Sequence, residues 1–271
     1  MTGPIFDTHA HYSSRAFDAD RIALLDSLPD KGVVGVCEQA THSGDAPRVL
    51  ELAHRYPWVV AAIGIHPESL LPAADCGEEG PAPTVSVYGG DWAAEMQALM
   101  PYYDDPKVVA VGECGLDYHW PVPKDAQLAL FEAEIRLALE LDKPIIVHDR
   151  QAHADVYALL KKYRPKGIVH CYSGSAEDAV QLAAQGLYIG FGGACPFTGA
   201  QRVATAIEAL PLDAIVLETD CPYMAPEPVR GTRCDSSLIR YVGEYIAQLR
   251  GISAEEVFRT TAENARRVYG L

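Results

Sequence analysis

The sequence has few basic residues, and this scarcity limits the partners that the protein can bind. Its 271 residues include 22 Lys and Arg against 37 Asp and Glu, which gives a formal net charge of −15 at pH 7. Broad, salt-driven adhesion to nucleic acid depends on many basic side chains, so the composition excludes it. The charge does not exclude nucleic acid from a local site where metal ions supply positive charge.

Long apolar runs and paired cysteines are also missing. No segment reaches the roughly 20 apolar residues of a membrane helix, and the N-terminus does not resemble a secretory signal. The seven cysteines are odd in number and include no CxxC pair. We therefore expect reduced thiols and a cytoplasmic location without a membrane partner, and we do not expect a zinc site built from thiolates.

Short apolar segments alternate with helix-length segments along the whole chain. We expect strands at residues 5–6, 32–37, 58–65, 108–112, 144–147, 167–169, 187–191 and 214–218. Their nearly continuous apolar runs are typical of parallel strands buried on both faces. The pattern predicts an α/β fold, a (β/α)8 TIM barrel that forms a single domain over residues 1–271. An open doubly wound sheet is the alternative, but no glycine-rich phosphate loop follows the first strand.

Helices and one long loop connect these strands. Helices are expected at residues 45–56, 125–141, 152–163, 176–186, 201–210, 236–250 and 254–269, and another begins at Asp91. Asp91 and Ser175 are predicted N-caps, and Gly186 is a predicted C-terminal glycine. Residues 71–90 are rich in Pro and Gly. Because the alternation resumes after them, we expect a loop insertion at about 71–90 rather than a linker.

Imidazole and carboxylate side chains stand at the carboxyl ends of the expected strands. The first strand continues into Asp7, His9 and His11, which alternation places on one face. Two imidazoles on one face can bind the same divalent metal ion. Taken alone, the His-x-His motif could instead be two histidines at a strand end that are hydrogen-bonded separately. The candidate ligands over the whole chain are His9, His11, Glu113, His148, His170 and Asp220. In a barrel these strand ends meet at one rim, so the sequence predicts a shared metal site there.

Seven segments occur in this order: FDTHAH, IGIHP, VGECGLDY, IIVHDR, VHCYSGS, LETDCPYMAP and TTAENARRVYGL. Together they resemble the TatD family of metal-dependent hydrolases, relatives of the amidohydrolase barrels, over essentially the whole chain. The resemblance implies a deoxyribonuclease-like phosphodiesterase with two divalent ions. One ion would be held by His9, His11, Glu113 and Asp220. The other would be held by Glu113, His148 and His170, so that Glu113 is shared.

The chemistry of these residues agrees with the implied activity. A carboxylate such as Glu113 can bridge two cations about 3.5–4 Å apart, and such a pair can clamp a phosphate and activate water. Asp220 can act both as a ligand and as a general base, so Asp220 and Glu113 are the predicted catalytic residues. No Ser or Cys with a paired base offers another nucleophile. Histidines favour zinc, whereas carboxylates and a phosphate substrate leave magnesium or manganese open.

Further residues near the strand ends could contact the substrate or orient a ligand. His66, Arg150 and Arg233 are the predicted substrate-binding residues, while Glu218 and Asp7 could orient a ligand imidazole. TatD proteins usually have a basic residue followed by Asn-Glu-Pro after the eighth strand. Here Arg233 is present without that tripeptide, a departure in a loop above the rim, where substrate choice is made.

Three functions are consistent with the barrel and its rim residues. The first is a metal-dependent deoxyribonuclease or phosphodiesterase that acts on DNA, at single strands or ends. The second is an amidohydrolase-type enzyme that cleaves an amide, ester or lactone of a small molecule. The third is an inert binding protein, against which the complete ligand set argues. Basic and aromatic residues at the rim would favour the first function.

Overall fold

The chain forms one eight-stranded sheet with the strands in sequence order. The computed structural model describes residues 3–71, 88–195 and 201–271, so most of the predicted insertion at 71–90 lies outside the described residues. The sheet runs from β1 to β8, and the pairs β3–β4, β4–β5 and β7–β8 are parallel. After β8, Cys221 forms an isolated parallel bridge with Ala10, the last residue of β1. This strand order, together with the bridge between the ends of β1 and β8, confirms the predicted (β/α)8 barrel.

Most expected elements are present within a few residues of their predicted ends. The strands are β1 (Ile5–Ala10), β2 (Val33–Gln39), β3 (Val59–Ile63), β4 (Val108–Asp117), β5 (Ile145–Arg150), β6 (Gly167–Val169), β7 (Leu187–Phe191) and β8 (Ile215–Leu217). The helices are α1 (Arg21–Ser27), α2 (Ala46–Arg55), α3 (Trp92–Leu99), α4 (Lys124–Glu140), α5 (His153–Tyr163), α6 (Ala176–Ala184), α7 (Gln201–Ala209), α8 (Ile239–Arg250) and α9 (Ala254–Tyr269). Short 3-10 helices include η3 (Pro67–Leu70) and η6 (Ser236–Leu238). Helix α1 and the 3-10 helix η3 are among the elements that the sequence pattern did not predict.

The predicted helix caps are confirmed. Asp91 accepts a hydrogen bond from the backbone N–H of Ala94 at 3.1 Å, and Ser175 accepts one from Asp178 at 3.0 Å. Gly186 has a φ of +95° at the end of α6, a conformation in which glycine avoids the steric cost of a side chain. These local signals therefore define where α3 and α6 begin and where α6 ends.

Strands β4 and β5 end later than the sequence pattern predicts. β4 continues past Gly112 to Asp117, and β5 continues past Val147 to Arg150. The reason is pairing between the two strands, which places Gly115 opposite His148 and Asp117 opposite Arg150. Ladder hydrogen bonds thus extend both strands through polar residues, where an apolar run alone does not show them. As a result, Glu113 and His148 lie inside strands rather than beyond their ends.

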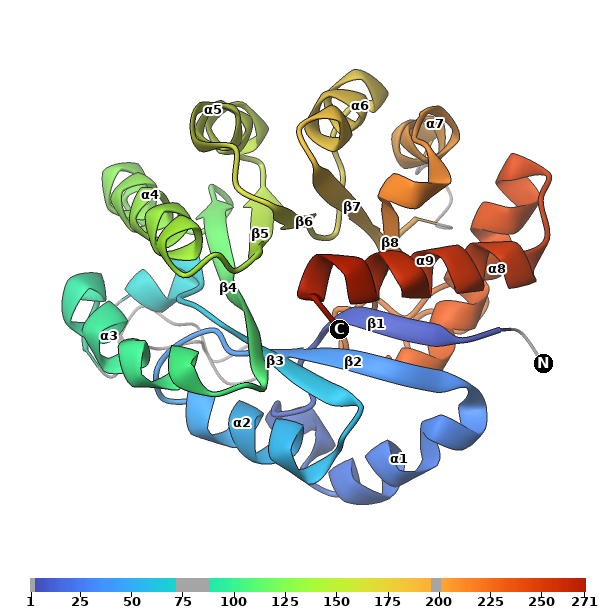
Figure 1. Ribbon diagram of the computed structural model, residues 1–271, viewed down its shortest axis with the longest axis horizontal. Helices are drawn as coiled ribbons and strands as arrows, with labels where there is room; N and C mark the ends of the chain where they lie inside the picture. Colours follow the sequence, from blue (N-terminus) through green and yellow to red (C-terminus); the bar gives the residue numbers. More distant parts are fainter. Residues whose placement is uncertain (1–2, 72–87, 196–200) are drawn as a thin grey trace. The chain divides into compact units, whose positions relative to one another are not determined.

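The chain divides into two compact units. Unit 1 comprises Met1–Tyr12, Ala16–Cys37 and Ile168–Leu271. Its helix α9 packs against β1, as Figure 1 shows, and the Tyr269 hydroxyl donates to the Thr8 carbonyl at 2.8 Å. Gly243 of α8 makes room for α9, because a Cβ atom there would lie 2.3 Å from the Phe258 ring. Burial of this helix against the strands stabilises the unit.

Unit 2 comprises Ser13–Arg15 and Glu38–Gly167. Helix α4 covers β4 and buries Leu130, Phe131 and Ile135 completely. β3 and β4 approach closely at Gly64, where a Cβ atom would lie 2.6 Å from the Gly112 Cα atom. Because neither Gly64 nor Gly112 has a side chain, the backbone just before Glu113 can pass this close to the backbone that follows β3.

The predictions about domains and location have different outcomes. The single domain over residues 1–271 stays a prediction, because the division into two units does not test it. Within the described ranges, no helix is long and apolar enough to cross a membrane. The cytoplasmic location likewise stays a prediction.

Candidate metal centre

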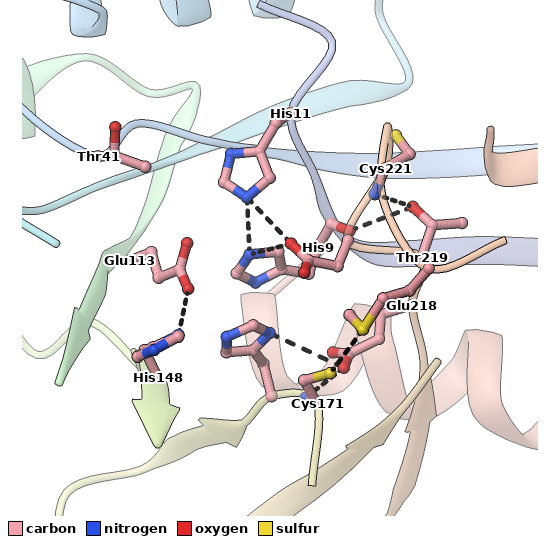
Figure 2. Close-up of polar contacts among 12 residues, drawn as sticks. His9, His11, Thr41, Glu113, His148, Cys171, Glu218, Thr219 and Cys221 are labelled. Carbon is pink, nitrogen blue, oxygen red and sulfur yellow. Dashed lines mark hydrogen bonds and ion pairs between the residues drawn. The ribbon is translucent and has the colours of Figure 1, made fainter. Parts of the chain in front are cut away.

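Unit 2 contains a group of imidazole and carboxylate side chains that can hold a metal ion. Ligand atoms of His66, Glu113 and His148 lie within 4.8 Å of one another. Figure 2 shows the Glu113 carboxylate facing His148, with Oε1 3.0 Å from the His148 Nδ1 atom. The Nε2 atom of His66 is 3.7 Å from the same oxygen. Mixed nitrogen and oxygen donors suit zinc and other first-row divalent ions, so these residues fit a metal.

The local fold of β4 directs Glu113 into this group. Between Val111 and Cys114 the pairing of β4 with β5 changes register, so Glu113 lies at a bulge. A bulge bends its strand and changes the direction of a side chain, and bulges are frequent beside active sites. Gly115 follows with a φ of +141°, and a Cβ atom there would lie 2.0 Å from the His148 carbonyl oxygen. A side chain at this position would therefore push β4 away from His148.

Asp117 is a functional candidate that the sequence analysis missed. Its carboxylate is buried, and its Oδ2 atom lies 3.0 Å from the His148 Nε2 atom. When His148 donates from Nε2 to Asp117, the lone pair of Nδ1 faces Glu113 and can bind a metal ion. The available signal was the four-residue spacing of Glu113 and Asp117, which puts both on one strand face. Because the sequence pattern predicts that this strand ends at Gly112, it does not place Glu113 and Asp117 on a common strand face.

Electrostatics support an ionised Asp117 beside a basic His148. Burial alone would lower the pKa of His148, but hydrogen bonds to Asp117 and Glu113 raise it to about 10. Burial would also raise the pKa of Asp117, but the hydrogen bond from His148 keeps it below its usual value. A metal ion and a proton therefore compete for the same imidazole nitrogen.

Unit 1 contains a second group, formed by His9, His11 and Asp220. Figure 2 shows His9 beside His11, and their Nε2 atoms lie 3.1 Å apart. Asp220 Oδ1 is 3.3 Å from His11 Nε2 and 3.7 Å from His9 Nε2. Burial would raise the pKa of Asp220, but its hydrogen bond with His11 and the charge of His9 hold it below the ordinary value. Two imidazole nitrogens and a carboxylate that converge in this way also fit a divalent ion.

Backbone contacts place the ligands of this second group. β1 ends at Ala10, so His9 lies inside the strand and His11 directly follows it. The Asp220 N–H donates to the His9 carbonyl at 2.9 Å, and the His11 N–H donates to the Cys221 carbonyl at 2.9 Å. Asp220 has a φ of +62°, a left-handed conformation that aspartate tolerates better than most residues. The segment after β8 therefore carries Asp220 directly beside both histidines.

His170 lies in unit 1 against His9. The two rings stack with centroids 3.9 Å apart and an angle of 7° between planes. The Nδ1 atom of His170 is 3.9 Å from Glu218 Oε1. The same Glu218 oxygen accepts a hydrogen bond from the Cys171 N–H. Burial raises the pKa of Glu218 to about 8, although the charge of His170 opposes this change. Glu218 thus faces a predicted ligand imidazole, while the ligand set predicted for His170 stays a prediction.

Asp7 has a different use from the one proposed for it. Its carboxylate is fully buried and accepts four hydrogen bonds from backbone N–H groups and hydroxyls. The donors are His9 N, Thr219 N, Thr219 Oγ1 and Ser236 Oγ. Burial raises the pKa of Asp7 to about 6 despite these bonds. Asp7 therefore connects β1 to the segment that carries Asp220 and orients backbone rather than an imidazole.

The three predicted substrate residues lie in different surroundings. His66 is buried, and its Nδ1 atom accepts from the Glu68 N–H at 3.2 Å, so Nε2 faces Glu113. Arg150 ends β5, and its side chain is 47% exposed. Arg233 donates to both oxygens of Asp20, at 2.8 and 2.6 Å. His66 is therefore part of the unit 2 group and Arg150 lies near it, whereas the Arg233 guanidinium already binds a carboxylate.

Comparison with known proteins places the chain in a family. The family described as TatD related DNase matches residues 6–270. The chain is 36% identical to the uncharacterized metal-dependent hydrolase YabD of Bacillus subtilis, over 98% of this chain and 99% of the relative. It is 30% identical to the 3'-5' ssDNA/RNA exonuclease TatD of Erwinia tasmaniensis, over 98% of this chain and 100% of the relative.

A solved structure agrees with these sequence relations. YjjV, a TatD homologue from Escherichia coli K12, superposes with a TM-score of 0.87 at 28% identity and covers 100% of both chains. The match covers all eight strands of the barrel. The chain therefore belongs to the TatD family and is a metal-dependent hydrolase.

Proposed function

We propose that the protein hydrolyses phosphodiester bonds in DNA, at single strands or strand ends, and that it uses two divalent metal ions. The observation that carries this proposal is the pair of histidine–carboxylate groups, one in each unit of a TatD barrel. The Erwinia tasmaniensis relative, named as a 3'-5' exonuclease of single-stranded DNA and RNA, supports the choice of substrate. DNA is the substrate class that we assign to this chain.

The metal ligands in this proposal are the six predicted residues. One ion is assigned to His9, His11 and Asp220, and the other to Glu113 and His148 with His170. Divalent ions at such sites polarise a phosphoryl oxygen and lower the pKa of water. That Glu113 serves both ions stays a prediction from the family resemblance. Zinc, manganese and magnesium remain the candidate metals, because the donor set contains both imidazoles and carboxylates.

Asp220 is the proposed general base. Its side chain is 20% exposed, and its pKa lies below the ordinary value, so the carboxylate is ionised at neutral pH. An ionised carboxylate at this position can accept the proton of the attacking water. The hydrogen bond from the Asp220 N–H to His9 fixes the backbone from which the carboxylate projects. Arg150 and His66 are the proposed contacts to phosphate oxygens, because Arg150 lies 3.9 Å from Asp117 and His66 lies 3.7 Å from Glu113.

Single-stranded oligonucleotides, bis(p-nitrophenyl) phosphate and a panel of amides and lactones test the proposal. We expect metal-dependent cleavage of the phosphodiesters, loss of activity with excess chelator, and recovery when divalent ions are added. Asp220→Asn should lower kcat by about 10²–10⁴-fold, the usual contribution of a general base. Asp213→Asn, which changes an exposed aspartate in a short 3-10 helix, is the matched control.

Two outcomes would contradict the proposal. Full phosphodiesterase activity in chelator or in Asp220→Asn would exclude the mechanism. Metal-dependent activity confined to amides or lactones would replace the nuclease with the amidohydrolase-type alternative.

A further inference from the structure

An exposed tryptophan lies in the loop between β4 and α4 of unit 2. Trp120 is 42% exposed, whereas Val122, two residues later, is buried. The Cζ atom of Arg150 lies 6.0 Å from the centre of the Trp120 ring, and the Arg150 side chain is 47% exposed. The His119 ring meets Trp120 edge-on with centroids 5.0 Å apart. Val122 rather than Trp120 therefore anchors this loop in the core, and the indole is presented to solvent.

Hydrogen bonds hold this loop in one conformation. Gln127 of α4 is buried; its Oε1 atom accepts from the Asp117 N–H at 2.7 Å, and its Nε2 atom donates to the Asp117 and Val122 carbonyls. The Tyr118 N–H donates to the Arg150 carbonyl at 2.9 Å, and the Tyr118 hydroxyl donates to Asp155 at 2.6 Å. The residues on both sides of Trp120 are thus tied to α4, β5 and α5. A fixed loop loses little conformational entropy when a ligand binds to it.

Short contacts connect this loop to the unit 2 metal group. In the β4–β5 ladder Asp117 lies opposite Arg150, and alternation puts Arg150 on the same strand face as His148. Arg150 Nη1 is 3.9 Å from Asp117 Oδ2, the oxygen that lies 3.0 Å from His148 Nε2. The guanidinium therefore lies beside the carboxylate that contacts His148, and the indole lies on the other side of that guanidinium, within the same compact unit.

The chemistry of this surface selects a particular ligand. An exposed indole presents a π-face to any nucleobase, and Arg beside it can bind a phosphate oxygen. A neighbouring cation such as Lys124, whose Nζ atom lies 3.8 Å from the Tyr118 ring centre, adds positive charge to an acidic protein. Bases in a duplex are already stacked and cannot lie on the indole without unstacking. The combination favours a single strand, whose bases are accessible.

We propose that Trp120 and Arg150 bind one nucleotide of a single-stranded substrate beside the scissile bond, with its base on the indole and its phosphate at the guanidinium. The inference rests on the proposed function and specifies how that site holds its substrate. Because the π-face of every base is similar, binding here is tolerant of sequence. Selection is therefore for single strands rather than for particular bases.

Binding experiments with a phosphorothioate oligothymidylate, which resists cleavage, test this proposal in the metal-loaded protein. Trp120→Ala should weaken its binding about 5- to 100-fold, and Trp120→Phe should recover most of the affinity, because phenylalanine also stacks. An abasic oligonucleotide of the same length should bind Trp120→Ala and the unchanged protein equally. Tryptophan fluorescence should be quenched by the oligothymidylate in the unchanged protein and much less in Trp120→Phe.

Tyr163→Ala is the matched control, because Tyr163 also lies under a cation, with the Arg136 Cζ atom 4.9 Å from its ring centre, but at the end of α5. It should leave oligothymidylate binding unchanged. Equal losses for oligothymidylate and abasic ligand, or no loss in Trp120→Ala, would overturn the inference while cleavage persists. A protein that neither binds nor cleaves oligonucleotides would instead overturn the proposed function, and this inference with it.

Discussion

Each compact unit holds a histidine group beside a fully buried aspartate, but the two aspartates make different contacts. In unit 1, Asp7 accepts four hydrogen bonds from backbone N–H groups and hydroxyls. In unit 2, Asp117 accepts from the His119 N–H and faces the His148 imidazole. A buried carboxylate beside a group of candidate metal ligands can therefore act in two ways. It can fix the chain that carries a ligand, as Asp7 does, or orient the ligand ring, as Asp117 does.

The largest expected effect concerns Glu113, which is predicted to serve both ions. Glu113→Ala should lower the affinity for both ions, whereas His148→Ala should mainly remove the ion assigned to unit 2. Metal content of the purified variants, measured by elemental analysis, separates these cases. Retention of two tightly held ions by Glu113→Ala would show that the two histidine groups do not share this carboxylate.

Asp7 should matter for stability more than for metal affinity. Asp7→Ala leaves several buried donors without an acceptor, so we expect the free energy of unfolding to fall by at least about 3 kcal/mol. Asp7→Asn should be milder, because its amide oxygen still accepts and the two hydroxyls can rotate. Chemical denaturation of both variants with chelator present measures the difference. Equal stability of Asp7→Ala and the unchanged chain would contradict this role.

Asp117 should show the opposite profile. Asp117→Ala removes the partner of His148 Nε2, and we expect metal affinity to fall about 10- to 100-fold. Nitrogen NMR of His148 in the metal-free protein should show that its preferred tautomer or charge state changes. Asp105→Ala is the control, because Asp105 binds the distant His54 ring at 2.7 Å. If both variants bind metal like the unchanged protein, then Asp117 does not orient the ligand ring.

The smallest expected effect is a difference in pH dependence between the units when chelator is present. The folded chain raises the pKa of His148 from 6.5 to about 10, so its contribution to stability is complete below pH 6.5 and is lost towards pH 10. The pKa of Glu218 rises from 4.5 to about 8, so its contribution is present below pH 4.5 and is lost towards pH 8. Thermal denaturation across pH should become flatter in the upper window for His148→Gln and in the lower window for Glu218→Gln. If thermal stability depends on pH in the same way in both variants, then His148 and Glu218 do not act in different pH ranges.

Strand periodicity and helix-end signals were sufficient to predict most of the fold. Apolar runs located the eight strands, and Asp91 and Ser175 marked helix starts, because these signals act between residues close in sequence. The sequence pattern does not predict helix α1, and it predicts that β4 ends at Gly112 rather than at Asp117. The continuation of β4 to Asp117 depends on pairing with β5, about thirty residues later in the chain, which no local pattern contains.

By itself, the sequence determined which side chains can carry the chemistry. The ends of the expected strands supplied His9, His11, Glu113, His148, His170 and Asp220, and the motif order supplied the family. Local alternation and strand order are enough for this, since a parallel barrel collects strand ends at one rim.

Only the tertiary structure decided which groups meet. It placed Asp117 behind His148, stacked His170 on His9, and occupied Arg233 with Asp20, which lies more than 200 residues away in the chain. These contacts depend on strand register, on the bulge at Glu113 and on the path of the segment that carries Arg233 to Asp20. Such relations join residues distant in sequence, so no local pattern of residues specifies them.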